Sequence, residues 1–273
     1  MSANTPVAAF FDLDKTIIAT SSAFAFGKEF LHNGMITRQE AWDLYLSKAQ
    51  YMLVGQSSEK MDSTRDALAQ MVAGWEVEDI QRITRETLRE VVAPAIYAEA
   101  RELIAAHKDA GHHVIIISAS AKILVEPIAQ ELGVDTVVAT EMAIENGKLT
   151  GEITRYLKGE AKAEAVRQFA ADHNFDLDAS FAYSDSATDI PMLELVGNPV
   201  AVNPDRALKK HALANGWQAR TFKNPEPLFQ MPNAREVGIG AGVIAGVTAL
   251  AVAGVFIARA VGGKGSDDKR HSA

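Results

Sequence analysis

The chain contains no cysteine among its 273 residues. This absence excludes disulfide bonds, thiol nucleophiles and thiolate metal sites, and it is typical of proteins from a reducing compartment. The N-terminal region has no basic stretch followed by an apolar one, so we expect no secretory signal there. An excess of basic charge is also lacking, because the formal net charge is -8. General binding to nucleic acids, which requires clustered Lys and Arg, is therefore not expected.

Charge is missing altogether from one long run near the C-terminus. Residues 237–258 are 22 consecutive residues without a charged side chain. As a helix they would extend about 33 Å, enough to cross a hydrocarbon core of about 30 Å. A buried core helix is the alternative, but soluble helices rarely carry so long an uncharged stretch. We therefore predict a transmembrane helix over residues 237–258, followed by a polar tail over residues 259–273.

Glycine recurs in this predicted membrane helix in four-residue register, at Gly238, Gly242, Gly246 and, after a gap of eight residues, Gly254. Small residues at this spacing let membrane helices approach closely, so the segment is a candidate surface for a homodimer. Basic residues are more frequent after the segment than before it, which by itself favours a tail on the inside. Because no export signal is visible, we expect the preceding domain to lie in the cytoplasm.

The rest of the chain alternates short apolar runs with stretches of helical pattern, which predicts a mostly parallel sheet with helices on both faces. Asn146-Gly147 within residues 142–153 predicts a β-hairpin. The expected strands are residues 7–11, 114–117, 136–139, 181–183 and 199–202, and the expected helices are residues 95–110, 121–132 and 160–173.

Residues 20–94 differ from this pattern, because they are rich in helix-forming residues and offer no strand-like run. We interpret them as a helical insert. Residues 1–19 and 95–219 then form the α/β core, and residues 220–236, with three prolines, form an irregular linker. Helices of the insert are expected at residues 36–54, 57–73 and 77–92.

Polar side chains follow three of the predicted strands. Asp12 and Asp14 come after the first strand, Ser118 after the second and Asp185 after the fourth. The carboxyl ends of parallel strands share one edge of the sheet, so these groups should converge. Carboxylate oxygens suit Mg²⁺. A carboxylate beside such a cation can attack phosphorus to form an aspartyl-phosphate, while a hydroxyl and a lysine neutralise the phosphoryl oxygens.

These residues resemble the four motifs of the haloacid dehalogenase superfamily of phosphohydrolases. The motifs are represented by Asp12-Leu13-Asp14-Lys15-Thr16, by Ser118, by a lysine, and by Asp185 with Asp189. The insert after the first motif resembles the first cap class of that superfamily, and the core resembles the branch related to phosphoserine phosphatase. The resemblance implies a Rossmann-like α/β core with a helical cap inserted after the first strand.

The resemblance also implies roles for individual residues. Asp12 would be the nucleophile and a Mg²⁺ ligand. Asp14 would be the general acid and then the general base, with its backbone carbonyl on the metal. Ser118 would bind the transferred phosphoryl group, and Asp185 would be a further metal ligand. Two more residues, Thr16 and Asp189, would support the site.

The phosphate-binding lysine has two candidates. Lys162 is preferred, because its spacing of 23 residues to Asp185 is similar to that in phosphoserine phosphatases. Lys158 is the alternative.

Two positions depart from the family pattern. Ser184 stands where the fourth motif usually has glycine, and Ser21 stands where phosphoserine phosphatases carry a glutamate that binds the substrate's amino group. An ammonium without a partner in a closed site is costly, so Ser21 argues against phosphoserine as the substrate.

We therefore predict a Mg²⁺-dependent phosphomonoester hydrolase that acts through an aspartyl-phosphate. Its substrate would be a small phosphorylated metabolite or, given the predicted membrane helix, a lipid head group. Two alternatives are a phosphotransferase that passes the group to an alcohol and a membrane-tethered protein that binds a phosphorylated ligand without turnover. The presence of Asp14 argues against the second, because loss of the acid and base would be the simplest route to inactivity.

Overall fold

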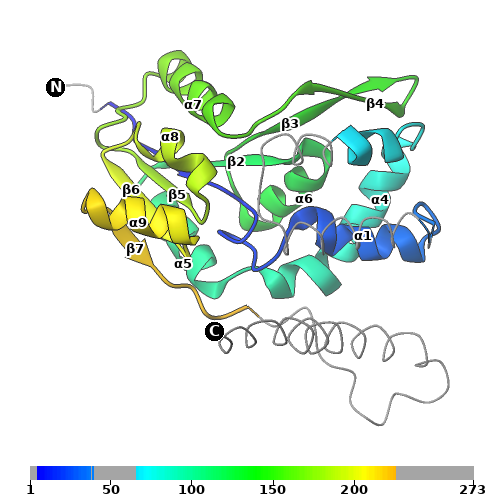
Figure 1. Ribbon diagram of the computed structural model, residues 1–273, viewed down its shortest axis with the longest axis horizontal. Coiled ribbons are helices and arrows are strands. Elements are labelled where there is room, and N and C mark those ends of the chain that lie inside the picture. The colour runs from blue at the N-terminus through cyan, green and yellow to red at the C-terminus, as the bar shows by residue number, and fades with distance from the viewer. Residues whose placement is uncertain (1–4, 38, 40–65, 226–273) are drawn as a thin grey trace, which may run out of the picture. The chain divides into compact units, whose positions relative to one another are not determined.

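The computed structural model describes residues 5–37, 39 and 66–225, which include a seven-stranded sheet of order β4-β3-β2-β1-β5-β6-β7 (Figure 1). Neighbouring strands are parallel except β3 and β4, which form an antiparallel pair. The predicted parallel sheet is thus confirmed, with one antiparallel edge. The strands are β1 (Ala8–Phe11), β2 (His113–Ala121), β3 (Thr136–Glu145), β4 (Lys148–Arg155), β5 (Phe181–Ser184), β6 (Asn198–Val202) and β7 (Gln218–Arg220).

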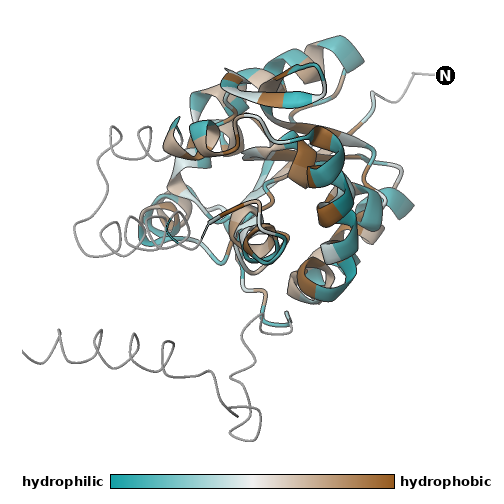
Figure 2. Cartoon of the chain, turned by 90° about the vertical axis from the view of Figure 1, so that its right-hand side faces the viewer, coloured by the Kyte–Doolittle hydropathy of each residue, from teal (hydrophilic) through white to brown (hydrophobic). Residues whose placement is uncertain are grey.

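Helices follow the strands as the alternating pattern predicts, and Figure 2 shows hydrophilic and hydrophobic residues on different sides of them. The predicted helix over residues 160–173 coincides with α7, while β7 and the helix α9 are not predicted. Arg220 ends β7 and so does not belong to the predicted linker. The α-helices are α1 (Ser22–His32), α4 (Val77–Thr87), α5 (Ala98–Asp109), α6 (Lys122–Leu132), α7 (Glu160–His173), α8 (Ile190–Leu193) and α9 (Arg206–Ala214).

Strand β1 is buried on both faces, because its side chains alternate between two separate hydrophobic clusters. Ala9 and Phe11 belong to the cluster that includes side chains of α5 and α6. Ala8 and Phe10 belong to the cluster that includes side chains of α7, α8 and α9. Such burial explains why the strand is almost entirely apolar and why it ends abruptly at the first polar residue, Asp12.

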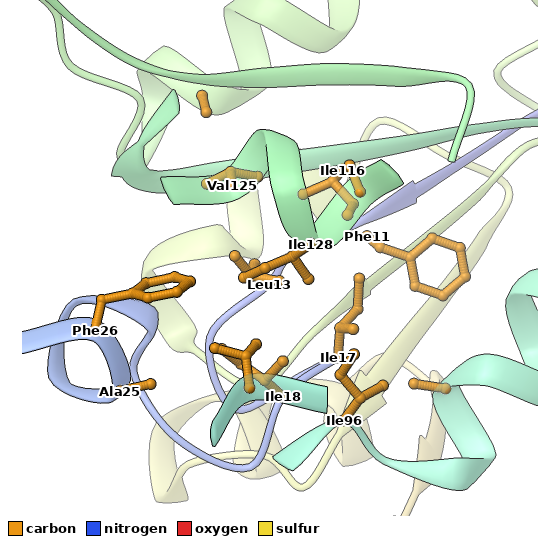
Figure 3. Close-up of a cluster of buried hydrophobic side chains, with 14 of the residues drawn as sticks. Phe11, Leu13, Ile17, Ile18, Ala25, Phe26, Ile96, Ile116, Val125 and Ile128 are labelled. Carbon is orange, nitrogen blue, oxygen red and sulfur yellow. The ribbon is translucent and has the colours of Figure 1, made fainter. Parts of the chain in front are cut away.

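The helical cap region begins with α1, which the sequence pattern does not predict. Its residues include Ser, Phe and Gly27, which favour helix only weakly. Burial overrides this preference: Phe26 and Ala25 lie against the core beside Leu13 and Ile128, as Figure 3 shows. Residues 38 and 40–54 of the first predicted cap helix, residues 36–54, and residues 57–65 of the second, residues 57–73, lie outside the described residues.

The later part of the cap region continues from α4 into a π-helix, Leu88–Val92, and a 3-10 helix, Ala93–Ala95. The predicted helical segment over residues 77–92 is therefore confirmed, but its last five residues form a π-helix instead of an α-helix. In addition, residues 66–71 are helical, and Gly74 follows them with a φ of 83°. This left-handed conformation suits the helix break predicted at Gly74.

The predicted hairpin is formed by β3 and β4, with Asn146 and Gly147 at φ values of 49° and 80°. Positive φ at both central residues is the requirement of a type I′ turn. The hairpin also bonds to the cap region: Val77 N–H donates to the Gly147 carbonyl at 2.9 Å, and Gly74 N–H donates to the Leu149 carbonyl at 2.7 Å. The hairpin thus joins the core sheet to the cap.

The predicted transmembrane segment, residues 237–258, and most of the predicted linker lie outside the described residues. Within residues 5–37, 39 and 66–225, no helix has the length and apolar character needed to cross a membrane.

Candidate active site

The ends of β1 and β5 bring the first and fourth motifs together. The two strands are parallel neighbours, with Phe11 in register with Tyr183. Asp12 N–H extends this pairing by donating to the Tyr183 carbonyl at 2.9 Å. Ser118 lies in β2, the neighbour of β1 on its other side. The predicted convergence at one sheet edge is therefore present in the structure.

Lys162 links Asp12 to Asp189 in the interior. Its ammonium nitrogen lies 2.6 Å from Oδ1 of Asp12 and 2.7 Å from Oδ2 of Asp189. The hydroxyl of Ser184 donates to the same Asp189 oxygen at 2.8 Å. Helix α7 carries Lys162 in its first turn, directly after Gly159 with a φ of 58°. The structure thus places Lys162, rather than Lys158, against the predicted nucleophile.

Burial and charge oppose each other in this cluster. Burial alone would lower the pKa of Lys162, but the carboxylates of Asp12 and Asp189 together raise it above its ordinary value. The ammonium is therefore charged. Burial raises the pKa of Asp12 to about 7, and Lys162 acts against this shift while Asp189 adds to it.

Asp14 faces the start of α1 instead of the lysine. Its Oδ1 accepts from Ser22 N–H at 2.8 Å, and its Oδ2 accepts from the Ser120 hydroxyl at 2.9 Å. Burial raises the pKa of Asp14, and these two hydrogen bonds oppose the rise. A raised pKa favours the protonated form of the carboxyl group, which general acid catalysis uses.

The C-terminal end of β2 carries Ser118 and Ser120. The buried Ser118 hydroxyl accepts from Ser120 N–H at 3.1 Å. The carbonyl of Ala119 accepts from the Thr140 hydroxyl at 2.8 Å, and Thr140 Oγ1 accepts from Leu157 N–H at 3.2 Å. These side chains fix the end of β2 on its neighbours. Sequence spacing reveals Ser118, but the contacts of Ser120 and Thr140 join residues too distant in the chain to be found that way.

Thr16 also contacts the predicted nucleophile, because its hydroxyl donates to Oδ2 of Asp12 at 3.3 Å. The turn between these residues is tight, with Lys15 at a φ of 62°. This left-handed conformation is strained for a residue with a side chain, and such strain is frequent at functional sites. The first motif thus forms a compact loop that directs two carboxylates, two residues apart, to different neighbours.

Asp185 is buried, and burial raises its pKa to about 6, while Lys15 acts against the shift. Its position depends on Asp205, whose N–H donates to the Asp185 carbonyl at 2.8 Å. The Asp205 carboxylate accepts from Ala187 N–H at 2.9 Å and from Leu208 N–H at 2.7 Å. Asp205 therefore caps α9 and holds the loop after β5. An Asp before a helical stretch is a recognisable cap signal, but its second contact is not.

The donor set fits a hard divalent cation. Asp12 and Asp185 follow the neighbouring strands β1 and β5, and burial raises the pKa of both. A cation bound between them would therefore stabilise their charged forms. The described residues contain no group of three His, Cys, Asp or Glu side chains arranged to hold a metal. The Asp14 carboxylate is engaged by Ser22 and Ser120.

The chain is similar to several bacterial proteins. A probable phosphatase of Mycobacterium tuberculosis is 44% identical over 254 residues, which cover 92% of this chain and 88% of that protein. A phosphoserine phosphatase of the same organism is 35% identical over 246 residues, covering 87% of this chain and 79% of the other. Both similarities extend over the core and the cap region together.

Solved structures with similar folds include a Bordetella pertussis protein of unknown function. It has 26% identity and a TM-score of 0.71, and the match covers 83% of this chain and all of that one. A phospho-aspartyl intermediate analogue of phosphoserine phosphatase matches with a TM-score of 0.58 and 20% identity, covering 81% of this chain and 95% of that one, which shows a shared fold. The model of haloacid dehalogenase-like hydrolases matches residues 9–194. Together with the site geometry, these matches show that the chain belongs to the haloacid dehalogenase-like hydrolases, in the branch that resembles phosphoserine phosphatase.

Proposed function

We propose that the protein is a Mg²⁺-dependent phosphatase that hydrolyses a small phosphomonoester through a phosphorylated Asp12. The observation that carries the proposal is the buried contact between Asp12 and Lys162, next to an Asp14 whose pKa is raised. A charged lysine beside a carboxylate nucleophile stabilises negative charge where phosphoryl transfer develops it. The similarity to proteins named as phosphatases supports the same reaction.

In the first step a carboxylate oxygen of Asp12 attacks the phosphorus atom. The bond from phosphorus to the leaving oxygen breaks as the new bond to Asp12 forms, and Asp14 donates its proton to the leaving oxygen. The raised pKa of Asp14 supports this role, because burial favours the protonated form that a general acid needs. The alcohol then leaves the site as a neutral product.

In the second step Asp14, now a carboxylate, takes a proton from a water molecule whose oxygen attacks the phosphorus. The bond between phosphorus and Asp12 breaks, inorganic phosphate is released, and Asp14 is again protonated. Lys162 stays charged throughout and offsets the negative charge around Asp12, while the Ser118 hydroxyl binds a phosphoryl oxygen. The cap region above this edge would limit the access of bulk water.

Mg²⁺ would be held by Asp12, Asp185 and the Asp14 backbone carbonyl. When bound, it would supply Lewis-acid stabilisation of the charge on the phosphoryl oxygens. The chain needs such a cation, because the buried ammonium of Lys162 is already shared between the carboxylates of Asp12 and Asp189. A phosphate dianion entering without further positive charge would meet a negative site.

The experiment that tests this function is hydrolysis of p-nitrophenyl phosphate by the full-length protein with and without Mg²⁺. Asp12→Asn should lower kcat/KM by at least about 100-fold, since it removes the nucleophile. Asp172→Asn, which changes an exposed carboxylate on α7, is the matched control and should keep full activity. Mg²⁺-dependent turnover by Asp12→Asn would contradict the mechanism.

The substrate class follows from what surrounds Asp14. Ser21, the N-cap of α1, occupies the position at which phosphoserine phosphatases carry a glutamate, and α1 has no acid in its first turn. We propose an alcohol without an amino group beside the phosphate. Phosphoserine should be a poorer substrate than glycerol phosphates in a panel of phosphomonoesters, and a preference for phosphoserine would contradict the assignment.

We also propose that residues 237–258 anchor the protein in a membrane with its catalytic domain in the cytoplasm. The support for the anchor is the 22-residue uncharged sequence. The basic residues that follow it would by themselves place the tail inside, so the orientation needs its own test. Protease accessibility in spheroplasts would test the orientation: the catalytic domain should be protected until the membrane is opened. Recovery of the full-length protein in the soluble fraction would contradict the anchor. Crosslinking in the membrane would test the proposed homodimer through the glycine-rich segment.

A further inference from the structure

We propose that Ser120 is a positioning residue for Asp14, holding its carboxyl group in the orientation that proton transfer to the leaving oxygen requires. The inference rests on the proposed phosphatase function and goes beyond it by assigning a role to a side chain outside the four motifs. The central observation is the 2.9 Å hydrogen bond from the Ser120 hydroxyl to Oδ2 of Asp14, between residues 106 positions apart.

Both oxygens of Asp14 are fixed from different directions. The main-chain N–H of Ser22 binds Oδ1 at 2.8 Å, and the Ser120 hydroxyl binds Oδ2. Two donors on separate elements define the rotation of a carboxyl group, whereas one donor leaves it free to turn. Ser22 lies at the N-terminus of α1, where the helix dipole favours a carboxylate. The hydroxyl of Ser22 donates in turn to Ser120 Oγ at 2.8 Å, so the Ser120 side chain is itself held.

The backbone of β2 explains how Ser120 reaches Asp14. The pairing of β2 with β3 shifts register between Ser118 and Ala121: Ser118 pairs with Ala139, while Ala121 pairs with Thr140. Between these two pairs β2 has two extra residues, Ala119 and Ser120, and β3 has no residue opposite them. Bulges of this kind redirect side chains and are frequent beside active sites.

The same bulge couples Ser120 to the phosphoryl-binding residue. Ser120 N–H donates to the Ser118 hydroxyl at 3.1 Å, while its side chain bonds to Asp14. One residue thus sets the spacing between the group proposed to bind the phosphoryl oxygen and the group proposed to protonate the leaving oxygen. Errors in such spacing reduce the rate even when the catalytic groups remain.

A positioning role and a purely structural role predict different substrate dependence. Protonation of the leaving oxygen matters more for a basic leaving group than for a weakly basic one. Phenyl phosphate and p-nitrophenyl phosphate have nearly the same shape, but phenolate is much more basic than p-nitrophenolate. A misplaced Asp14 should therefore slow phenyl phosphate more, whereas a distorted loop should slow both substrates equally.

The experiment measures kcat/KM for both substrates with the full-length protein. Ser120→Ala should lose about tenfold or more on phenyl phosphate and less than about threefold on p-nitrophenyl phosphate. Ser120→Thr keeps the hydroxyl and should restore phenyl phosphate hydrolysis. Asp172→Asn, which changes an exposed carboxylate on α7 outside this network, is the control, and both substrates should change by less than about threefold.

Equal losses on both substrates, or no loss on phenyl phosphate, would overturn the role of Ser120 and leave the phosphatase function standing. If the wild-type protein hydrolysed neither substrate nor any other phosphomonoester, the proposed function would fail first and the role of Ser120 with it. Thermal unfolding followed by circular dichroism checks the fold of each variant. If Ser120→Ala does not fold, Ser120→Cys, with a weaker donor of similar size, should show the same selective loss.

Discussion

The ammonium of Lys162 lies 2.6 Å from Oδ1 of Asp12, and both side chains are almost completely removed from water. A charge in such a position is stable only while its partners remain, because burial of an unpaired ion is strongly unfavourable. Removing the lysine would leave Asp12 and Asp189 as buried carboxylates without a countercharge. The contact therefore links the stability of the fold to the reactivity of the site.

We expect Lys162→Met to abolish turnover of p-nitrophenyl phosphate and to lower the free energy of unfolding by about 3–5 kcal/mol, as breaking a buried ion pair does. Lys158→Met is the comparison, because Lys158 is partly exposed and precedes α7. It should retain activity within about threefold. Urea unfolding and steady-state kinetics measure both effects. Equal losses in the two variants would show that the lysine has been assigned wrongly.

Asp205 offers a test of how the metal-binding loop is supported. Asp205→Ala removes the acceptor for Leu208 N–H at the start of α9 and for Ala187 N–H after Asp185. Loss of the helix cap should cost about 1 kcal/mol. The displaced loop should also raise the Mg²⁺ concentration that gives half-maximal activity, at least severalfold. Asp205→Asn keeps one acceptor oxygen, so its stability and its Mg²⁺ requirement should lie between those of the wild type and of Asp205→Ala. An unchanged Mg²⁺ dependence in Asp205→Ala would contradict the supporting role.

Gly151 in β4 tests the packing between the hairpin and the cap region. It has a φ of 87°, and a Cβ there would lie 3.0 Å from the Ala73 Cβ and 3.2 Å from the Ala69 carbonyl oxygen. Gly151→Ala should therefore cost more than the roughly 1 kcal/mol of backbone strain alone. Gly216→Ala is the matched control, because Gly216 has a φ of 67° and open space around it. The difference in urea unfolding between the variants measures the contact, and equal values would show that this packing is loose.

Sequence reasoning succeeds for this protein where a residue's role follows from short spacing. Asp12 and Asp14 end an apolar run, and the structure brings Lys162 and Asp189 to the same edge as the motif order implies. Sequence reasoning fails where contacts between residues far apart in the chain determine the structure. Helix α1 forms because Phe26 is buried against Leu13, although its local helix preference is weak. Ser120 reaches Asp14 only because of a bulge that no local pattern reveals.

His107 makes stability depend on pH at a site away from the catalytic residues. Its imidazole bonds to the Tyr183 hydroxyl at 2.7 Å and to Nδ1 of His112 at 2.8 Å. Burial, followed by the charges of His112 and Arg220, lowers the pKa of His107 to about 4. The unfolded chain therefore binds a proton at His107 near pH 6.5, while the native protein does not until about pH 4. Its contribution to stability is complete above pH 6.5 and is lost as the pH falls toward 4.

Asp12 and Asp185 act in the opposite direction, because their pKa values are raised in the native state and protonation then favours the fold. The contribution of His107 must therefore be measured against a variant. In His107→Gln, which cannot titrate but can still hydrogen-bond, the free energy of unfolding should fall less between pH 7 and pH 4.5 than in the wild type. The difference should be on the order of 1–2 kcal/mol. Parallel pH profiles for the two proteins would show that His107 is not held neutral by the fold.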